Sequence, residues 1–231
     1  MSNKELLSII IPVYNEEKTI ETLLDRVIAV ALPIPRELVI INDGSKDHSA
    51  KLIKVWMSKH PKEKIVYFEK KNGGKGSAIR TGFEKASGSI LVIQDADLEY
   101  NPQDHAKMLE TMFKEHLSVV YGSRFLLFRG NLSENYKLTF FFHLIGNLAL
   151  TILTNVLYGT KLTDMETCYK MMRRTVLQKF TLRSNAFDIE PEITAKILKN
   201  GFTIKEIQID YFIRLTYNPR FLDRTKQKKR S

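Results

Sequence analysis

The chain has 231 residues and a formal net charge of +10, and 43% of its residues are hydrophobic. This length and the lack of any low-complexity tract predict one globular domain with an ordinary core, and the single cysteine, Cys168, excludes an internal disulfide. The positive charge favours anionic partners, and the N-terminus, which has no signal-peptide pattern, predicts a cytoplasmic location.

Strands and helices are predicted to alternate through the first 95 residues. Residues 6–13 form a short, continuous apolar run typical of a buried parallel strand, and apolar residues then recur at helical spacing from Ile20 to Ile28. The same cycle follows twice more and leads into a further strand, giving strands at 37–41, 65–68 and 89–93 and helices at 49–60 and 77–86. Such alternation predicts an α/β fold with a mostly parallel sheet flanked by helices.

Acidic side chains follow two of these strands. Asp43 lies in the turn after the strand at 37–41, and Asp95 and Asp97 follow the strand at 89–93. Because parallel strands bring their carboxyl ends to one edge, the three acids are expected to share a crevice. Carboxylates there indicate metal-assisted phosphate chemistry. Taken singly, an ordinary Asp-Gly turn and a helix-capping turn explain them equally well.

The loop from Lys71 to Ser77 is rich in glycine and contains Lys75, which suits contact with a phosphate. It is not a Walker motif, because Gly76 rather than Ser or Thr follows Lys75. It is not a dinucleotide fingerprint either, because Ile79 occupies the position of the third glycine. The loop therefore favours neither of these two cofactor types.

Residues 138–157 are the most apolar part of the chain and are about long enough to cross a bilayer. His143, Asn147 and Asn155 would nevertheless form a polar stripe on one face of a helix. We therefore predict an amphipathic, membrane-interfacial helix at about 136–158, with packing on the domain core as the open alternative. The basic residues 223–231 are predicted to form a tail beyond a single domain of residues 1–222.

Several motifs make the chain resemble family 2 glycosyltransferases over residues 6–214. They are Ile11-Pro12-Val13-Tyr14-Asn15-Glu16-Glu17, Asn42-Asp43-Gly44-Ser45, Gly73-Gly74-Lys75-Gly76 and Asp95-Ala96-Asp97, in that order. Tyr121-Gly122-Ser123-Arg124 and the segment 162–170 are most similar to the branch of dolichol-phosphate mannose synthases and polyprenyl-phosphate glucosyltransferases. The resemblance implies the GT-A, Rossmann-like fold for binding nucleotide sugars.

The same resemblance implies an inverting, metal-dependent transfer of mannose or glucose. The donor would be GDP-mannose or UDP-glucose, and the acceptor a polyprenyl or dolichyl phosphate. The protein would then work on the cytoplasmic membrane face as a peripheral protein. The Lys and Arg residues are not gathered with aromatics into a known reader motif, so no nucleic acid partner is expected.

Resemblance also implies the residues that bind the donor. Pro12, Tyr14 and Glu16 would line the base and ribose pocket, while Asp43 would hold the nucleoside with Lys75 near that end. Mg²⁺ or Mn²⁺ would be bound by Asp95, Asp97 and Glu99, with Ala96 also at the donor.

Catalytic roles are expected for Asp97, Arg124 and Asp164. Arg124 follows a predicted strand at 118–122 and suits forked contacts with the donor phosphates or the acceptor. Asp164 is expected to position the acceptor first and to act as a base second, because a lipid phosphate is already anionic near neutral pH.

The carboxyl-terminal motif departs from the family pattern. Relatives follow an arginine equivalent to Arg214 with a Gly-rich, Lys-containing stretch that contacts the phosphates, whereas residues 214–221 of this chain contain no glycine. Arg214 and Arg220 are expected to bind the donor, with Arg220 at about the lysine spacing. A donor-binding pseudoenzyme remains an alternative, as does transfer to a polysaccharide or other hydroxyl acceptor with Asp164 or a neighbour as base.

Overall fold

The computed structural model describes residues 5–126 and 138–212, with side chains described throughout except at 138–144. Its centre is one seven-stranded sheet in the order β3-β2-β1-β4-β6-β5-β7. The strands are β1 (Leu7–Val13), β2 (Arg36–Asn42), β3 (Ile65–Glu69), β4 (Ile90–Ile93), β5 (Val119–Ser123), β6 (Lys170–Arg173) and β7 (Lys205–Gln208). The helices are α1 (Ile20–Ile28), α2 (Ser49–Lys59), α3 (Lys75–Lys85), α4 (Asp104–Lys114), α5 (Leu138–Tyr158), α6 (Arg174–Leu177) and α7 (Ile189–Lys199).

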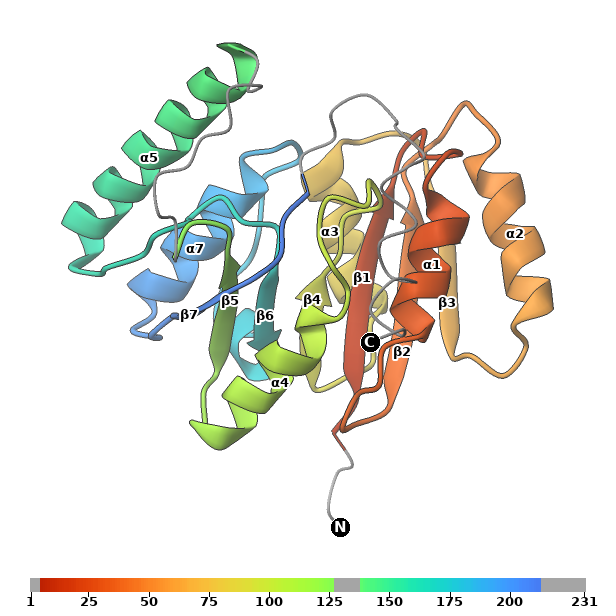
Figure 1. Cartoon of the computed structure of the whole chain (residues 1–231), viewed down its shortest axis with the longest axis horizontal. Helices are drawn as coiled ribbons and strands as arrows, with labels where there is room; N and C mark the ends of the chain where they lie inside the picture. The colour runs from red at the N-terminus through yellow and green to blue at the C-terminus, as the bar shows by residue number, and fades with distance from the viewer. Residues whose placement is uncertain (1–4, 127–137, 213–231) are drawn as a thin grey trace, which may run out of the picture.

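The predicted mostly parallel sheet flanked by helices is confirmed. β1 pairs in parallel with both β2 and β4, and β2 with β3, so the first four strands end at the same edge. β6 is antiparallel to its neighbours β4 and β5, which makes the sheet mixed at this point. Helices cover both faces of the sheet, and α5 lies at one end of the molecule, next to α7 (Figure 1).

The core sits on the central strands. β1 and β4 are apolar along nearly their whole length, and β2 is apolar over residues 38–41. All three strands are almost entirely buried, as strands between two helical layers must be. Helix α3 starts at Lys75, two residues earlier than predicted from the sequence, so Gly76 lies inside its first turn. This earlier start matters for the site, because it places Lys75 at the first residue of the helix.

A buried histidine in α4 should make stability depend on pH. His105 is fully buried, and neither ring nitrogen has a hydrogen-bond partner among the described residues. Burial lowers the pKa of His105 to about 3. The unfolded chain therefore binds an extra proton between that value and the ordinary histidine pKa, and stability falls as the pH falls through this window.

Replacing His105 with Phe is expected to remove this dependence. Between pH 7 and pH 5 the loss in the free energy of unfolding should shrink by about 2 kcal/mol, as measured by denaturant titration at both values. His48→Phe is the matched control, because His48 is exposed. An unchanged acid response in the His105→Phe protein would contradict the prediction.

Candidate functional site

The two aspartates after β4 lie in a network of opposite charges. Lys75 Nζ lies 2.9 Å from Asp95 Oδ2 and 2.8 Å from Glu190 Oε1, so one ammonium bridges two carboxylates. Lys75 was expected near the nucleoside end of the donor. In the structure α3 begins at Lys75, and its ammonium contacts Asp95 after the end of β4. The remaining oxygen of Glu190, Oε2, is buried and has no hydrogen-bond partner in the described structure.

Negative charge accumulates at Asp97. Burial, together with the charges of Asp95 and Glu99, raises the pKa of Asp97 to about 7. Burial alone would lower the pKa of Lys75, but Asp95, Cys168 and Glu190 raise it well above its ordinary value. The site thus has an excess of carboxylate charge at Asp97, which a cation would offset.

The three acids expected to bind the metal, Asp95, Asp97 and Glu99, do not form a ligand cluster in the described structure. No group of three or more His, Cys, Asp or Glu side chains within residues 5–126 and 145–212 is arranged to hold a metal ion. Glu99 Oε2 accepts a hydrogen bond of 2.6 Å from the Tyr211 hydroxyl, and Asp97 Oδ1 accepts one from the Glu99 amide. Mg²⁺ commonly uses one or two carboxylates and completes its shell with water and substrate phosphates, which Asp95 and Asp97 can support.

The glycine-rich loop donates hydrogen bonds to Asp43 and packs against residues 184–186. The amides of Gly73 and Gly74 donate to the Asp43 carboxylate, which also accepts a 2.6 Å bond from Lys70 Nζ. A β-carbon at Gly76 would lie 2.6 Å from the carbonyl oxygen of Ser184, so the segment at 184–186 packs directly on the loop. These two amides are therefore already bonded within the protein.

The residues predicted to bind the nucleoside lie at the ends of β1 and β2, where the two following loops bond to each other. The Asn15 amide donates to Ser45 Oγ and the Glu16 amide to Ser49 Oγ, which ties the loop after β1 to the loop after β2. Tyr14 is exposed, and Pro12 and Glu16 are half-buried. Asp43, in contrast, is buried and lies at the base of these loops.

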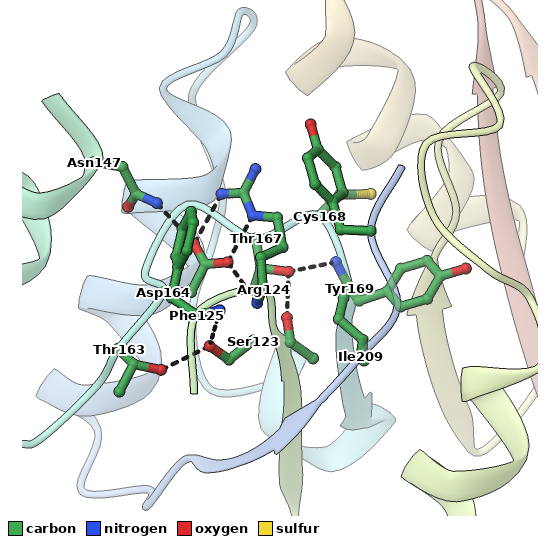
Figure 2. A network of polar contacts seen from close by, with 12 residues as sticks. Ser123, Arg124, Phe125, Asn147, Thr163, Asp164, Thr167, Cys168, Tyr169 and Ile209 are labelled. Carbon is green, nitrogen blue, oxygen red and sulfur yellow. Dashed lines mark hydrogen bonds and ion pairs between the residues drawn. The ribbon is translucent and has the colours of Figure 1, made fainter. Parts of the chain in front are cut away.

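Arg124 and Asp164 form a second charged centre, at the end of β5 (Figure 2). Arg124 Nε lies 2.7 Å from Asp164 Oδ2 and Nη2 lies 2.8 Å from Oδ1, a forked ion pair that the Arg124 amide supplements. Although burial would raise the pKa of Asp164, the bonds from Arg124 and Asn147 hold it below its ordinary value. The ionised form of Asp164 is therefore favoured, and both of its oxygens accept hydrogen bonds.

The loop before β6 carries Asp164 and is supported by a buried lysine. Lys170 Nζ donates a 2.7 Å bond to the Met165 carbonyl and lies 4.1 Å from the Tyr121 ring centroid. From β7, Glu206 Oε1 accepts the Asp164 amide at 2.9 Å. The carboxylate of Asp164 thus sits on a loop that is fixed from two strands.

Tyr211 joins the two charged centres. Its hydroxyl donates to Glu99, and the guanidinium of Arg124 lies 5.1 Å from its ring centroid. Neither Tyr211 nor Glu190 was predicted from the sequence, where their only local signals are an aromatic residue after a strand and an acid in the first turn of a helix. Arg214, Arg220 and the predicted tail at 223–231 lie outside the described residues.

Helix α5 has its polar side turned inward. Asn147, Thr151 and Thr154 are buried, while several large apolar side chains on the other side are exposed: Ile145, Leu148, Ile152, Leu153, Val156 and Leu157. Within the described residues, no helix has both the length and the apolar character needed to cross a membrane. The side chain of His143, from the predicted polar stripe, is not described.

Comparison with known proteins places these features in a family. Residues 8–181 match the family model described as glycosyl transferase family 2. The chain is 29% identical over 206 residues to an undecaprenyl-phosphate 4-deoxy-4-formamido-L-arabinose transferase from Pectobacterium atrosepticum, covering 88% of this chain and 58% of the relative. It is 30% identical over 191 residues to a dolichol-phosphate mannosyltransferase from Pyrococcus furiosus, covering 82% and 52%. The chain thus spans little more than half of these relatives.

Solved structures share the fold. Glucosyl-3-phosphoglycerate synthase from Mycobacterium tuberculosis, in complex with UDP, superimposes with a TM-score of 0.69 at 16% identity, over 98% of this chain and 77% of that one. A mannosyltransferase from Pyrobaculum calidifontis, in complex with GDP-Man and Mn²⁺, gives 0.63 at 18% identity, over 90% and 56%. These similarities and the family match confirm the predicted GT-A fold.

Proposed function

The chain belongs to glycosyl transferase family 2, and from this premise we propose that it transfers mannose or glucose from a nucleotide diphosphate sugar to a polyprenyl or dolichyl phosphate. The observation that carries the acceptor class is the Arg124–Asp164 pair. Both oxygens of Asp164 accept hydrogen bonds from Arg124, so this carboxylate is poorly placed to take a proton from an acceptor. A phosphate acceptor needs no such base, because it is already anionic.

The donor would bind across the ends of β1, β2 and β4. Pro12, Tyr14 and Glu16 would contact the base and ribose, and Asp43, whose carboxylate also accepts the amides of Gly73 and Gly74, would hold the nucleoside. Asp95 and Asp97 would hold Mg²⁺ or Mn²⁺, which when bound would stabilise the charge that develops on the leaving diphosphate. Solved structures that share the fold contain UDP or GDP-Man together with Mn²⁺, which supports a nucleotide-sugar donor and a divalent ion.

Arg124 would bind the acceptor phosphate and orient it for attack with inversion at the sugar carbon. Asp164 occupies Nε and Nη2 of the guanidinium, so Nη1 is the nitrogen that this carboxylate leaves for another anion. The names of the undecaprenyl-phosphate and dolichol-phosphate relatives support a lipid phosphate as the acceptor.

We also propose that one domain of residues 1–222 rests on the cytoplasmic face of a membrane through α5, with the basic tail at 223–231 adding attraction to anionic lipid. Replacing Leu153 and Val156 together with Asp is expected to reduce cosedimentation with anionic vesicles at least tenfold, because both side chains are more than half exposed. Val55→Asp, on the exposed side of α2, is the matched control. Equal vesicle binding by all three proteins would count against this surface.

A radiolabelled transfer assay tests the reaction. GDP-mannose and UDP-glucose are offered in turn to polyprenyl phosphate in detergent, with Mg²⁺ or Mn²⁺ and with an EDTA control. Label that enters the lipid fraction with one donor, and only with metal, supports the proposal and identifies the sugar. Donor binding without any transfer would instead indicate a pseudoenzyme.

A hydroxyl acceptor is the second candidate, and Glu166 favours it. This carboxylate is half-buried, and burial raises its pKa above the ordinary value despite the nearby Arg124. A carboxylate with a raised pKa beside the catalytic pair suits a general base. Transfer to a soluble oligosaccharide, but not to the lipid phosphate, would support this alternative.

A further inference from the structure

We propose that Asn147 is a positioning residue for the Arg124–Asp164 pair, so that helix α5 forms part of the acceptor site. The proposal rests on the proposed function, because it assigns the pair to the acceptor phosphate. From the sequence, Asn147 was predicted only to belong to a polar stripe. The structure places its amide on the carboxylate that holds Arg124, as Figure 2 shows.

The contact is short and buried. Asn147 Nδ2 donates to Asp164 Oδ1 at 2.9 Å, and Asn147 is only 4% exposed. The same oxygen accepts the bond from Arg124 Nη2. Because a forked ion pair requires the carboxylate and the guanidinium to share one plane, a donor that fixes Oδ1 also fixes the direction in which Arg124 points.

The orientation of the Asn147 amide is itself determined. Thr151, one turn further along α5, donates from Oγ1 to Asn147 Oδ1 at 3.1 Å, so the NH₂ group must face Asp164. Thr151 Oγ1 also accepts the Met165 amide at 3.2 Å. The helix therefore holds the Asp164 side chain through Asn147 and the backbone next to it through Thr151.

A second asparagine on the same face provides an internal comparison. Asn155 lies about two turns beyond Asn147 and also bonds to the loop after α5, but its partners are the amide and carbonyl of Leu162, at 2.8 Å each. It attaches the helix to the loop without touching Asp164. A variant without the Asn155 side chain therefore tests only the attachment of α5 to this loop.

The test compares Asn147→Ala with Asn155→Ala in steady-state transfer by the full chain. Asn147→Ala is expected to raise KM for polyprenyl phosphate about tenfold, the effect of one hydrogen bond to a charged group, with KM for the donor unchanged. Asn155→Ala is expected to leave both KM values unchanged. Thr151→Val, which keeps the side-chain volume, is expected to shift the acceptor KM in the same direction by a smaller factor.

The pH dependence of kcat/KM distinguishes a positioning role for Asn147 from a general loosening of the packing, which would not shift it. The Asn147 bond helps to lower the pKa of Asp164, so its loss should shift the acid limb of kcat/KM to higher pH. The charged and titratable groups that act on Asp164 from the surrounding elements are Arg124, Glu166, Lys170, Glu206 and Tyr100, and all variants retain them. Identical acceptor KM values and acid limbs for Asn147→Ala and Asn155→Ala would overturn the inference.

Binding of a short isoprenyl phosphate, measured by calorimetry, separates this inference from the proposed reaction. If the wild-type protein binds the probe but transfers no sugar, the proposed reaction fails, while weaker binding by Asn147→Ala alone still supports the positioning role. If the wild-type protein transfers sugar and Asn147→Ala binds the probe normally, only the positioning role fails. A wild-type protein that neither binds nor transfers overturns both.

Discussion

Replacing Asp97 with Asn is expected to reduce transfer at least about a thousandfold while the chain stays folded. The loss follows from the role proposed for this carboxylate, since a bound divalent ion contributes several kcal/mol of charge stabilisation in the transition state. Folding should not suffer, because the uncharged amide relieves repulsion from Asp95 and Glu99, the charges that raise the pKa of Asp97. Circular dichroism and Tm check the fold.

Glu99→Gln is the matched comparison for this prediction. Glu99 Oε2 accepts from the Tyr211 hydroxyl, and a glutamine oxygen can accept the same bond. If two aspartates and the diphosphate suffice for the metal, Glu99→Gln should keep most of the activity. Titration with Mn²⁺ should raise the Tm of the wild-type and Glu99→Gln proteins but not that of Asp97→Asn. Near-normal, metal-dependent turnover by Asp97→Asn would contradict the assignment of Asp97 as a metal ligand.

The fold could be predicted because its signals are local. Apolar runs and helical periodicity marked the first four strands and three helices, and parallel pairing then brings the acidic turns after β2 and β4 to one edge. The antiparallel β6 was not predicted, because the direction in which a four-residue strand enters a sheet depends on where the preceding chain returns to it.

The contacts within the site depend on residues that are distant in the sequence. Lys75 meets Glu190, and Asn147 meets Asp164, and no periodicity connects the members of either pair. The glycine-rich loop shows the same limit. Its composition suggested exposed backbone donors, but the amides of Gly73 and Gly74 bond to Asp43, and Gly74 and Gly76 make room for the chain at 184–186. A residue pattern indicates available chemistry, whereas packing decides its partner.

Removal of Arg124 should affect both stability and activity. Arg124→Ala leaves the fully buried Asp164 carboxylate without its ion-pair partner, which typically costs about 3 to 5 kcal/mol in the free energy of unfolding. Transfer should fall about a hundredfold or more, because the proposed phosphate ligand is lost. Without the guanidinium, burial would raise the pKa of Asp164, so the variant should lose stability as the pH rises above the ordinary aspartate range.

The double variant Arg124→Ala/Asp164→Ala separates these two effects. With both charges removed, no unpaired carboxylate remains, and most of the lost stability should return, while transfer should stay as low as in Arg124→Ala. Urea unfolding and the transfer assay measure the two quantities on the same preparations. Arg124→Lys completes the set, since it keeps the charge but cannot form the fork, and is expected to retain folding and lose most of the activity. Recovery of transfer in the double variant would show that Arg124 only neutralises Asp164 and does not bind the acceptor.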